Sequence, residues 1–281
     1  MDSAMHSAIE SKSSDTLRRL VGHLPCLALT GAGISAGTGI PTYRDRRGRW
    51  LRSDPIKHQE FIRDAAKRQR YWGRSMVGWP GVRDALPAPA HRSIARLQAR
   101  GAVAQIVTQN VDRLHQRAGA QAVTDLHGRL DRVLCLDCGD NSCREYLQGR
   151  LESLNPWLRP ALHEARPDGD ADLPDHTIEA VRVPDCERCG GTLMPDVVFF
   201  GGSIPAARVD ACRAALQDAQ SLLVIGSSLT VYSGFRFCRW AEAAGLPIFL
   251  INPGQSRADA IAEKCPLDAD LALAHLEELI A

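Results

Sequence analysis

Short apolar runs recur along the chain and alternate with longer segments of helical periodicity. The runs are rich in β-branched residues and bounded by Gly, Pro or Asn, which is typical of strands buried on both faces of a parallel sheet. These predicted strands span residues 26–30, 104–109, 196–200, 221–226 and 247–252. Predicted helices, with apolar residues at helical spacing, span residues 89–101, 208–220 and 234–245. The alternation predicts an α/β fold built on a doubly wound parallel sheet.

Two regions depart from this alternation. Residues 55–79 form a basic segment of helical character, and residues 133–192 hold two cysteine pairs around a Pro- and Asp-rich stretch typical of an exposed loop. We therefore predict a single domain over residues 1–281 with two lobes. The larger lobe is assigned residues 1–54, 80–132 and 193–281, and the smaller lobe is assigned residues 55–79 and 133–192.

The composition of the 281 residues narrows the possible partners. Lys plus Arg (34) nearly balances Asp plus Glu (33), which removes the electrostatic case for nucleic acid or an anionic membrane as the main partner. The first twenty residues lack an apolar core and carry acids, so they resemble neither a secretory signal nor a transit peptide. No apolar run approaches the ~18 residues of a membrane span. We expect a cytoplasmic protein that binds a small ligand or a peptide.

Four of the nine cysteines form two Cys-x-x-Cys units, and an odd total favours a metal site in a reducing compartment over a disulfide framework. Two such units complete a tetrahedral zinc site, and four thiolates leave no position for water, so the metal would be structural. Two unrelated turns or a redox pair are the weaker alternatives. Cys143 lacks the pair spacing, and His163 and His176 are expected to be solvated. The predicted ligands are Cys135, Cys138, Cys186 and Cys189.

A glycine-rich loop, TGAGISAGTGIP at residues 30–41, follows the first predicted strand. Gly31 to Ala36 match the G-x-G-x-x-G/A dinucleotide pattern, in which glycines let the backbone approach a phosphate. A tight turn between strand and helix explains the glycines about as well. The acid expected ~20 residues later on a second strand is missing, because that region is arginine-rich and not strand-like. An ordinary dehydrogenase is thus poorly supported, while a dinucleotide site stays open.

Taken together, the motifs resemble the sirtuin family of NAD-dependent protein-lysine deacylases. They occur in the family's order over nearly the whole chain: GAGISAGTGIPTYRD, TQNVDRLHQRAG, DLHG, the four cysteines, MPDVVFFGG, GSSLTVYSG and INPG. The continuation YRDRRGRW is most similar to the subgroup of the mitochondrial lipoamidase-type and ADP-ribosylating sirtuin and its bacterial relatives. The resemblance implies a Rossmann-like NAD-binding lobe, a smaller zinc-binding lobe, NAD as co-substrate and one structural zinc ion.

The resemblance also implies the chemistry. The acyl oxygen of a modified lysine attacks the nicotinamide ribose, nicotinamide leaves, and the acyl group ends on ADP-ribose. His127 matches the family's base near the ribose hydroxyls, a role that suits a group with a pKa near the working pH. Asn110 would hold the ribose and a water, and Asp112 would accept from the nicotinamide amide. Helix capping is a compatible second role for Asn110 or Asp112.

Further contacts follow from the same motifs. The peptide substrate would add as a strand against Val198, Phe199 and Gly201 and against the chain after Ser228. Relatives commonly carry an acid where this chain has Gly202, which affects peptide preference. The expected NAD contacts are Gly31, Ala32, Gly33, Ile34, Ser35, Arg44, Trp50, Gln109, Asn110, Val111, Asp112, Gly226, Ser227, Ser228, Asn252, Pro253, Gly254 and Asp270.

Three other functions are weighed against lysine deacylation. Protein mono-ADP-ribosyl transfer on the same fold is the main alternative, because both reactions begin with nicotinamide leaving. A non-catalytic NAD or ADP-ribose sensor would not require the base His127 together with Asn110 and Asp112. A metallo-hydrolase is disfavoured because four cysteines close the metal site.

Overall fold

The computed structural model describes residues 2–38, 55–158, 165–166 and 170–281. Within these residues, no helix combines the length and the apolar character needed to cross a membrane.

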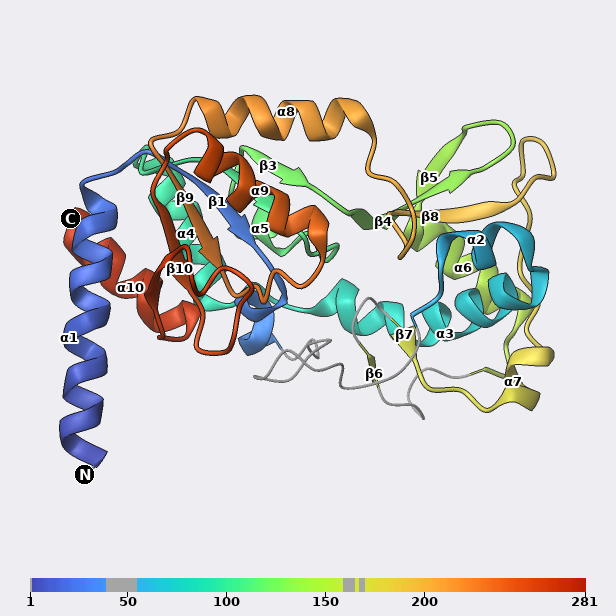
Figure 1. Cartoon of the computed structure of the whole chain (residues 1–281). Coiled ribbons are helices and arrows are strands. Elements are labelled where there is room, and N and C mark those ends of the chain that lie inside the picture. The colour runs from blue at the N-terminus through green and yellow to red at the C-terminus, as the bar shows by residue number, and fades with distance from the viewer. Residues whose placement is uncertain (1, 39–54, 159–164, 167–169) are drawn as a thin grey trace.

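A six-stranded parallel sheet forms the centre of the larger lobe (Figure 1). Its spatial order is β11-β10-β9-β1-β2-β3, so the chain builds outward from β1 in one direction and later continues from β9 in the other. This is the doubly wound order, and it places a topological switch point between β1 and β9, outside their carboxyl ends. The strands are β1 (Cys26–Thr30), β2 (Val103–Thr108), β3 (Val123–Asp125), β9 (Ser221–Ile225), β10 (Ile248–Ile251) and β11 (Glu263–Cys265).

Helices cover both faces of this sheet, as its fully buried strands β1 and β9 require. One hydrophobic cluster joins the sheet to three helices on one face, and a second cluster joins it to two helices on the other. The first set is α1 (Asp2–Val21), α4 (Pro89–Ala99) and α10 (Ala269–Ile280), and the second is α8 (Ala206–Gln217) and α9 (Tyr232–Ala243). The predicted α/β fold with a doubly wound parallel sheet is confirmed.

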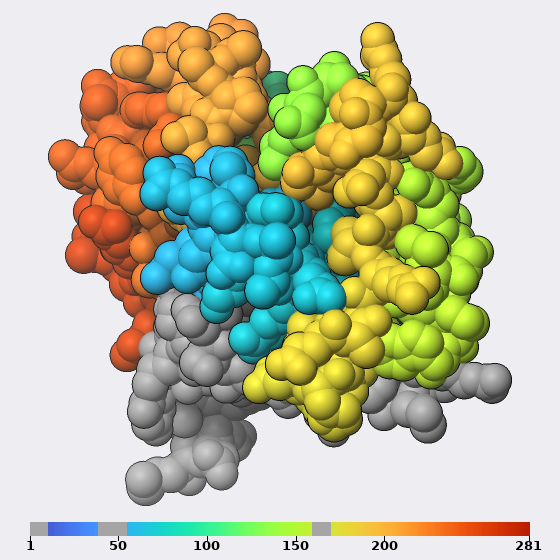
Figure 2. Space-filling model, turned by 90° about the vertical axis from the view of Figure 1, so that its right-hand side faces the viewer, coloured from blue at the N-terminus to red at the C-terminus, as the bar shows by residue number. Residues whose placement is uncertain are grey.

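The smaller lobe is built on a three-stranded antiparallel sheet, β5-β4-β8, of β5 (Asn141–Cys143), β4 (Gly128–Cys135) and β8 (Leu193–Val197). A separate hydrophobic cluster packs helices on it, including Phe61, Trp72 and Leu147. Figure 2 shows the α2–α3 segment, in blue to teal, between the orange C-terminal elements and the yellow and green elements of this lobe. The lobe also contains α2 (His58–Arg63), α3 (Ala65–Asp84), α6 (Arg144–Leu154), α7 (Asp175–Glu179) and the hairpin β6 (Ala165–Arg166) and β7 (Asp170–Ala171).

The structure corrects one predicted strand. Residues 196–200 were expected in the parallel sheet, but β8 ends at Val197 and pairs antiparallel with β4. Residues 55–79 are helical as predicted, although Asp64 divides them by capping α3 through hydrogen bonds from Ala66 and Lys67. The division of the chain into lobes at the residues given above stays a prediction.

Candidate active site and metal centre

The loops that follow β1 and β9 meet at the switch point, backbone against backbone. A Cβ on Gly33 would lie 2.7 Å from the Cα of Gly226, and a Cβ on Gly31 would lie 2.9 Å from the Gly226 carbonyl oxygen. Gly226 itself has a φ of +60°, and a Cβ there would lie 2.5 Å from the Ile34 nitrogen. Only glycine fits these positions. This close packing accounts for the glycines and sets the start of the seven-residue 3-10 helix η1 (Ala32–Thr38) at the sheet edge.

Ser35 on η1 organises a buried polar network beside this loop. Its hydroxyl donates to Asp112 Oδ2 at 3.0 Å and accepts from Asn110 Nδ2 at 3.1 Å. His91 Nδ1 accepts from the Ala88 amide, so its proton is on Nε2, which faces Ser35 Oγ at 3.4 Å. The network therefore holds the side chains of Asn110 and Asp112 in fixed positions at the end of β2.

Asp112 is placed for more than one role. Its Oδ1 accepts from the Leu114 amide at 3.0 Å, which supports the start of the short helix α5 (Leu114–Arg117). Burial raises the pKa of the Asp112 carboxyl, although the hydrogen bonds from Leu114 and Ser35 oppose this shift. Val111 and Asp112 also line a cavity of about 360 Å³ with Trp79 and Val82. The predicted helix-start role of Asp112 is thus present, and its other side faces Ser35.

Other predicted cofactor residues hold the loops of the sheet edge together. Gln109 Nε2 donates to Ser227 Oγ at 2.9 Å, and Ser228 Oγ lies 3.0 Å from Thr230 Oγ1. Asn252 Nδ2 donates to the Gly254 carbonyl at 2.9 Å. These side chains therefore fix the geometry of the strand-end loops in which the sequence placed them.

Asp270 lies on α10, away from those strand-end loops in the sequence. Its Oδ1 accepts from the Ala90 amide at 2.7 Å, at the first turn of α4. A carboxylate at a helix N-terminus is stabilised by the helix dipole. Its Oδ2 also approaches Gly37 of η1, where an added Cβ would lie 3.4 Å away. The side chain thus packs between α4 and η1.

His127 lies at the end of β3, between the two lobes. Its Nδ1 is 2.9 Å from the Gln109 carbonyl oxygen, and a carbonyl can only accept, so Nδ1 carries the ring proton. Nε2 is then an acceptor, and the Ser233 hydroxyl of α9 donates to it at 2.8 Å. Burial lowers the pKa of His127, and the nearby charges of Arg208 and Arg236 lower it further. The ring is therefore neutral near pH 7, with its basic lone pair on Nε2.

The predicted substrate segments lie on either side of His127. The Val198 amide donates to the His127 carbonyl at 2.7 Å, and Ser233, on the chain that follows Ser228, contacts the ring. Phe199 stacks on Phe61 of α2 at a centroid distance of 5.0 Å. Gly201 has a φ of +75°, and nothing occupies the space beside it. The structure thus brings both segments together at the imidazole.

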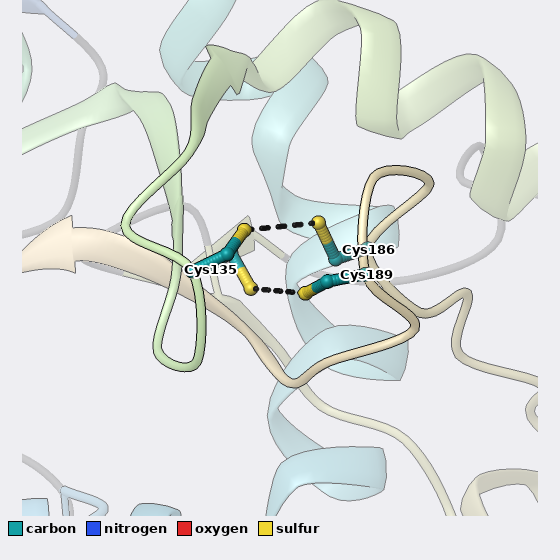
Figure 3. A group of neighbouring side chains, drawn as sticks. Cys135, Cys186 and Cys189 are labelled. Carbon is teal, nitrogen blue, oxygen red and sulfur yellow. Dashed lines mark hydrogen bonds between the residues drawn. The ribbon is translucent and has the colours of Figure 1, made fainter.

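The four cysteines of the two Cys-x-x-Cys units converge in the smaller lobe (Figure 3). All four Sγ atoms lie within 4.8 Å of one another, with Cys135 and Cys189 3.5 Å apart and Cys138 and Cys186 3.8 Å apart. A tetrahedral ion with Zn–S bonds of about 2.3 Å separates its ligand atoms by about 3.8 Å. The donor set and its spacing therefore fit one zinc ion.

The structure also shows where two other residues considered as metal ligands lie. Cys143 is exposed and is not part of the cluster, as predicted. His176 lies on α7 and does not belong to the cluster either. His163, Arg44 and Trp50 lie outside the described residues, so their assignments stay predictions.

Sequence reasoning missed several polar residues that the fold brings to the site. Ser233 contacts the base, His91 supports Ser35, and Arg208 and Arg236 place positive charge beside His127. Ser233 was within a quoted motif, but no spacing rule linked it to a histidine 106 positions earlier. The other three lie on helices whose amphipathic pattern shows burial but not which loop they face.

Comparison with known proteins agrees with this geometry. The model of the Sir2 family matches residues 31–233. An NAD-dependent protein deacetylase of Xanthomonas axonopodis pv. citri is 50% identical over 258 residues, which are 91% of this chain and 87% of that protein. The mitochondrial NAD-dependent protein lipoamidase sirtuin-4 of Bos taurus is 47% identical over 239 residues, covering 84% of this chain and 76% of that protein.

A solved structure of a Sir2 protein with a p53 peptide and NAD+ has a TM-score of 0.72 and 27% identity, covering 92% of this chain and 95% of that one. The same fold therefore extends over both lobes. With a matched family model and relatives that are half identical over most of its length, the chain belongs to the Sir2 family.

Proposed function

We propose that this protein is an NAD-dependent protein-lysine deacylase, which passes the acyl group of a modified lysine to ADP-ribose and releases nicotinamide. The observation that carries the proposal is the tautomer of His127. Its Nδ1 proton is held by the Gln109 carbonyl, which leaves the Nε2 lone pair as a base in the cleft. A neutral imidazole whose pKa lies below its ordinary value is ready to take a proton from a hydroxyl at neutral pH.

The NAD site is proposed at the switch point, over the loops of Gly31 to Ser35 and of Gly226 to Ser228. Bound NAD supplies the glycosidic bond that the reaction breaks. Asn110 Nδ2 donates to Ser35 Oγ and to the Gly31 carbonyl, so the amide oxygen of Asn110 and the carboxyl group of Asp112 are the groups proposed to meet the ligand at this edge. Arg44, Trp50, Asn252, Pro253, Gly254 and Asp270 remain proposed contacts as well.

The acyl-lysine peptide is proposed to lie along Val198, Phe199 and Gly201. The relative solved with a p53 peptide supports a peptide substrate. Zinc, proposed at the four cysteines, is closed to substrate and stabilises the smaller lobe. Unpaired cysteines throughout support a cytoplasmic location, and the balanced charge argues against nucleic acid or a membrane as partner.

The names of the relatives, deacetylase and lipoamidase, favour deacylation over mono-ADP-ribosyl transfer. The available base argues against a non-catalytic sensor. The decisive assay measures nicotinamide release on lysine peptides that carry acetyl, longer aliphatic, acidic or lipoyl groups, with and without NAD.

We expect His127→Ala to lower turnover about 10²- to 10⁴-fold, the usual range for a general base. NAD binding and zinc content should stay near those of the wild type. Full activity of this variant, or turnover without NAD, would contradict the proposal. Loss of zinc together with activity would assign His127 to the metal site instead.

A further inference from the structure

Positive charge gathers around His127 on the side where the peptide is proposed to bind. On α9, Arg236 follows Ser233 by three residues and so lies on the same helix face. Its guanidinium lies over the rings of Tyr232 and Trp240, at 5.6 and 5.9 Å from their centroids. Arg236 Nε is buried without a hydrogen-bond partner in the described part of the chain.

Arg208 adds a second charge from α8. Its Nη1 donates to the carbonyl of Leu126, the residue before His127, at 3.2 Å. Among the described residues, neither Arg208 nor Arg236 has a carboxylate within ion-pair distance. Burial is the main cause of the lowered pKa of His127, and the charges of Arg208 and Arg236 add smaller contributions in the same direction. The two arginines therefore flank the base without compensation.

Lys57 adds a third positive charge beside the proposed peptide segment. Lys57 forms a parallel bridge with Phe200, and the backbone amide of His58 donates to the Phe200 carbonyl at 2.9 Å. Gly202 packs close to the His58 side chain, where an added Cβ would lie 3.4 Å from the His58 Cβ. One acid, Glu60, lies nearby, with Oε2 accepting from the Lys57 amide.

Asp125, two residues before His127, and Asp196, whose backbone carbonyl lies against Gly128, do not offset this charge, because each has its own arginine. Asp125 pairs with Arg113, and Asp196 pairs with Arg132. The field that a bound peptide meets is therefore set mainly by Arg208 and Arg236. Charged walls around a cleft attract a ligand of the opposite sign and reject one of the same sign.

We propose that this cleft selects acyl-lysine peptides with aspartate or glutamate within about three residues of the modified lysine. At about 3.3 Å per residue in an extended strand, three residues span about 10 Å, which is the distance over which exposed charges interact at about 0.1 M salt. The inference rests on the proposed function and concerns the sequence around the lysine rather than the acyl group.

The test compares three peptides that share one acyl-lysine and differ only in acidic, neutral or basic flanking residues. We expect kcat/KM for the acidic peptide to exceed that for the basic one about tenfold at low salt, and this ratio to shrink at high salt as the charges are screened. Equal kcat/KM values for the three peptides, or a preference for basic flanks, would overturn the inference.

Substitution of each arginine tests which residues cause the preference for acidic peptides. Arg236→Gln and Arg208→Gln should each reduce the acidic-to-basic ratio about two- to threefold, as expected for partly exposed charge pairs. The ratio compares two peptides on the same variant, so any effect of the substitution on His127 that is common to both peptides cancels. Arg239→Gln is the matched control, because Arg239 is paired with Glu242 on the same helix and should leave the ratio unchanged. A ratio that neither Arg236→Gln nor Arg208→Gln alters would assign selectivity elsewhere and overturn the inference.

The outcome also separates the two proposals. No turnover of any of the three peptides would contradict the proposed function. Turnover without a charge preference would contradict this inference alone. The NAD dependence and the unfolding midpoint of each variant should match the wild type, which confirms that a changed ratio is not caused by misfolding.

Discussion

The base site and the cysteine cluster are joined by a single strand, but they are held together by different forces. His127 immediately precedes β4, and Cys135 is its last residue. Around His127, every polar atom of the ring has a protein partner, and the neighbouring loops pack as glycine backbone on glycine backbone. At the cysteines, four thiol groups, which are metal ligands when deprotonated, lie within 4.8 Å of one another. The cleft is thus built by the protein's own contacts, whereas the cluster is complete only with an ion.

The largest effect is expected from removing one cluster ligand. Cys186→Ser should release the metal and lower the free energy of unfolding by about 4–5 kcal/mol, because metal binding at such sites is part of the folding free energy. Zinc content and chemical denaturation measure both quantities. Cys143→Ser is the control, since Cys143 is exposed and outside the cluster. A zinc-loaded Cys186→Ser protein of normal stability would rule out the four-cysteine site.

A smaller effect, confined to the cleft, is expected from Gly33→Ala. Its Cβ would meet the Gly226 backbone, which cannot rotate away, so the loops must separate at a cost of about 3 kcal/mol. The KM for NAD should rise and zinc content should not change. Gly149→Ala on α6 is the matched control, because nothing lies within 4 Å of that position and alanine favours a helix. Equal behaviour of the two variants would show that the loops are not tightly packed.

Lowering the pH should also reduce the stability of the fold around the proposed NAD site before it releases the metal ion. Burial lowers the pKa of His91 to about 4 and that of His115 to about 3, while the unfolded chain keeps the ordinary value of 6.5. Below this value the unfolded state binds protons that the fold excludes, so stability falls as the pH falls. Between about pH 7 and 5.5 the two groups together should cost about 2 kcal/mol.

Denaturation at both pH values, with zinc content measured in parallel, checks this expectation. His115→Asn should remove about half of the pH-dependent loss, because one of the two excluded protons is gone. Stability that is independent of pH in this range would show that the two rings bind protons in the fold as readily as in the unfolded chain.

The sequence predicted β1, β9 and β10 of the parallel sheet well because these strands are buried on both faces and appear as unbroken apolar runs. The edge strands β3 and β11 are three residues long and only partly buried, and the sequence did not predict them. The smaller sheet was harder. β4 alternates buried and half-buried residues, and the apolar run of β8 looks the same in a parallel or an antiparallel sheet. The position of β8 in the antiparallel sheet is decided by its pairing with β4, and the local sequence of the run does not encode that pairing.

The residues of the candidate site also fall into two groups, those that the sequence identified and those that it did not. Cysteine spacing and the order of the motifs identified the metal ligands and His127, because both are local patterns. Ser233, Arg208 and Arg236 lie on helices far away in sequence, and only the packing of α8 and α9 against the sheet brings them to the imidazole. Their charge and hydrogen bonding were therefore not predictable from periodicity.

The hydrogen bond between His127 Nδ1 and the Gln109 carbonyl has a practical consequence. A ring proton held by a backbone oxygen exchanges slowly with water, so it should give a resolved imidazole resonance in a proton NMR spectrum. That resonance would be a label-free reporter at the reacting centre, and its shift on adding peptide or nucleotide would record binding beside His127 without turnover.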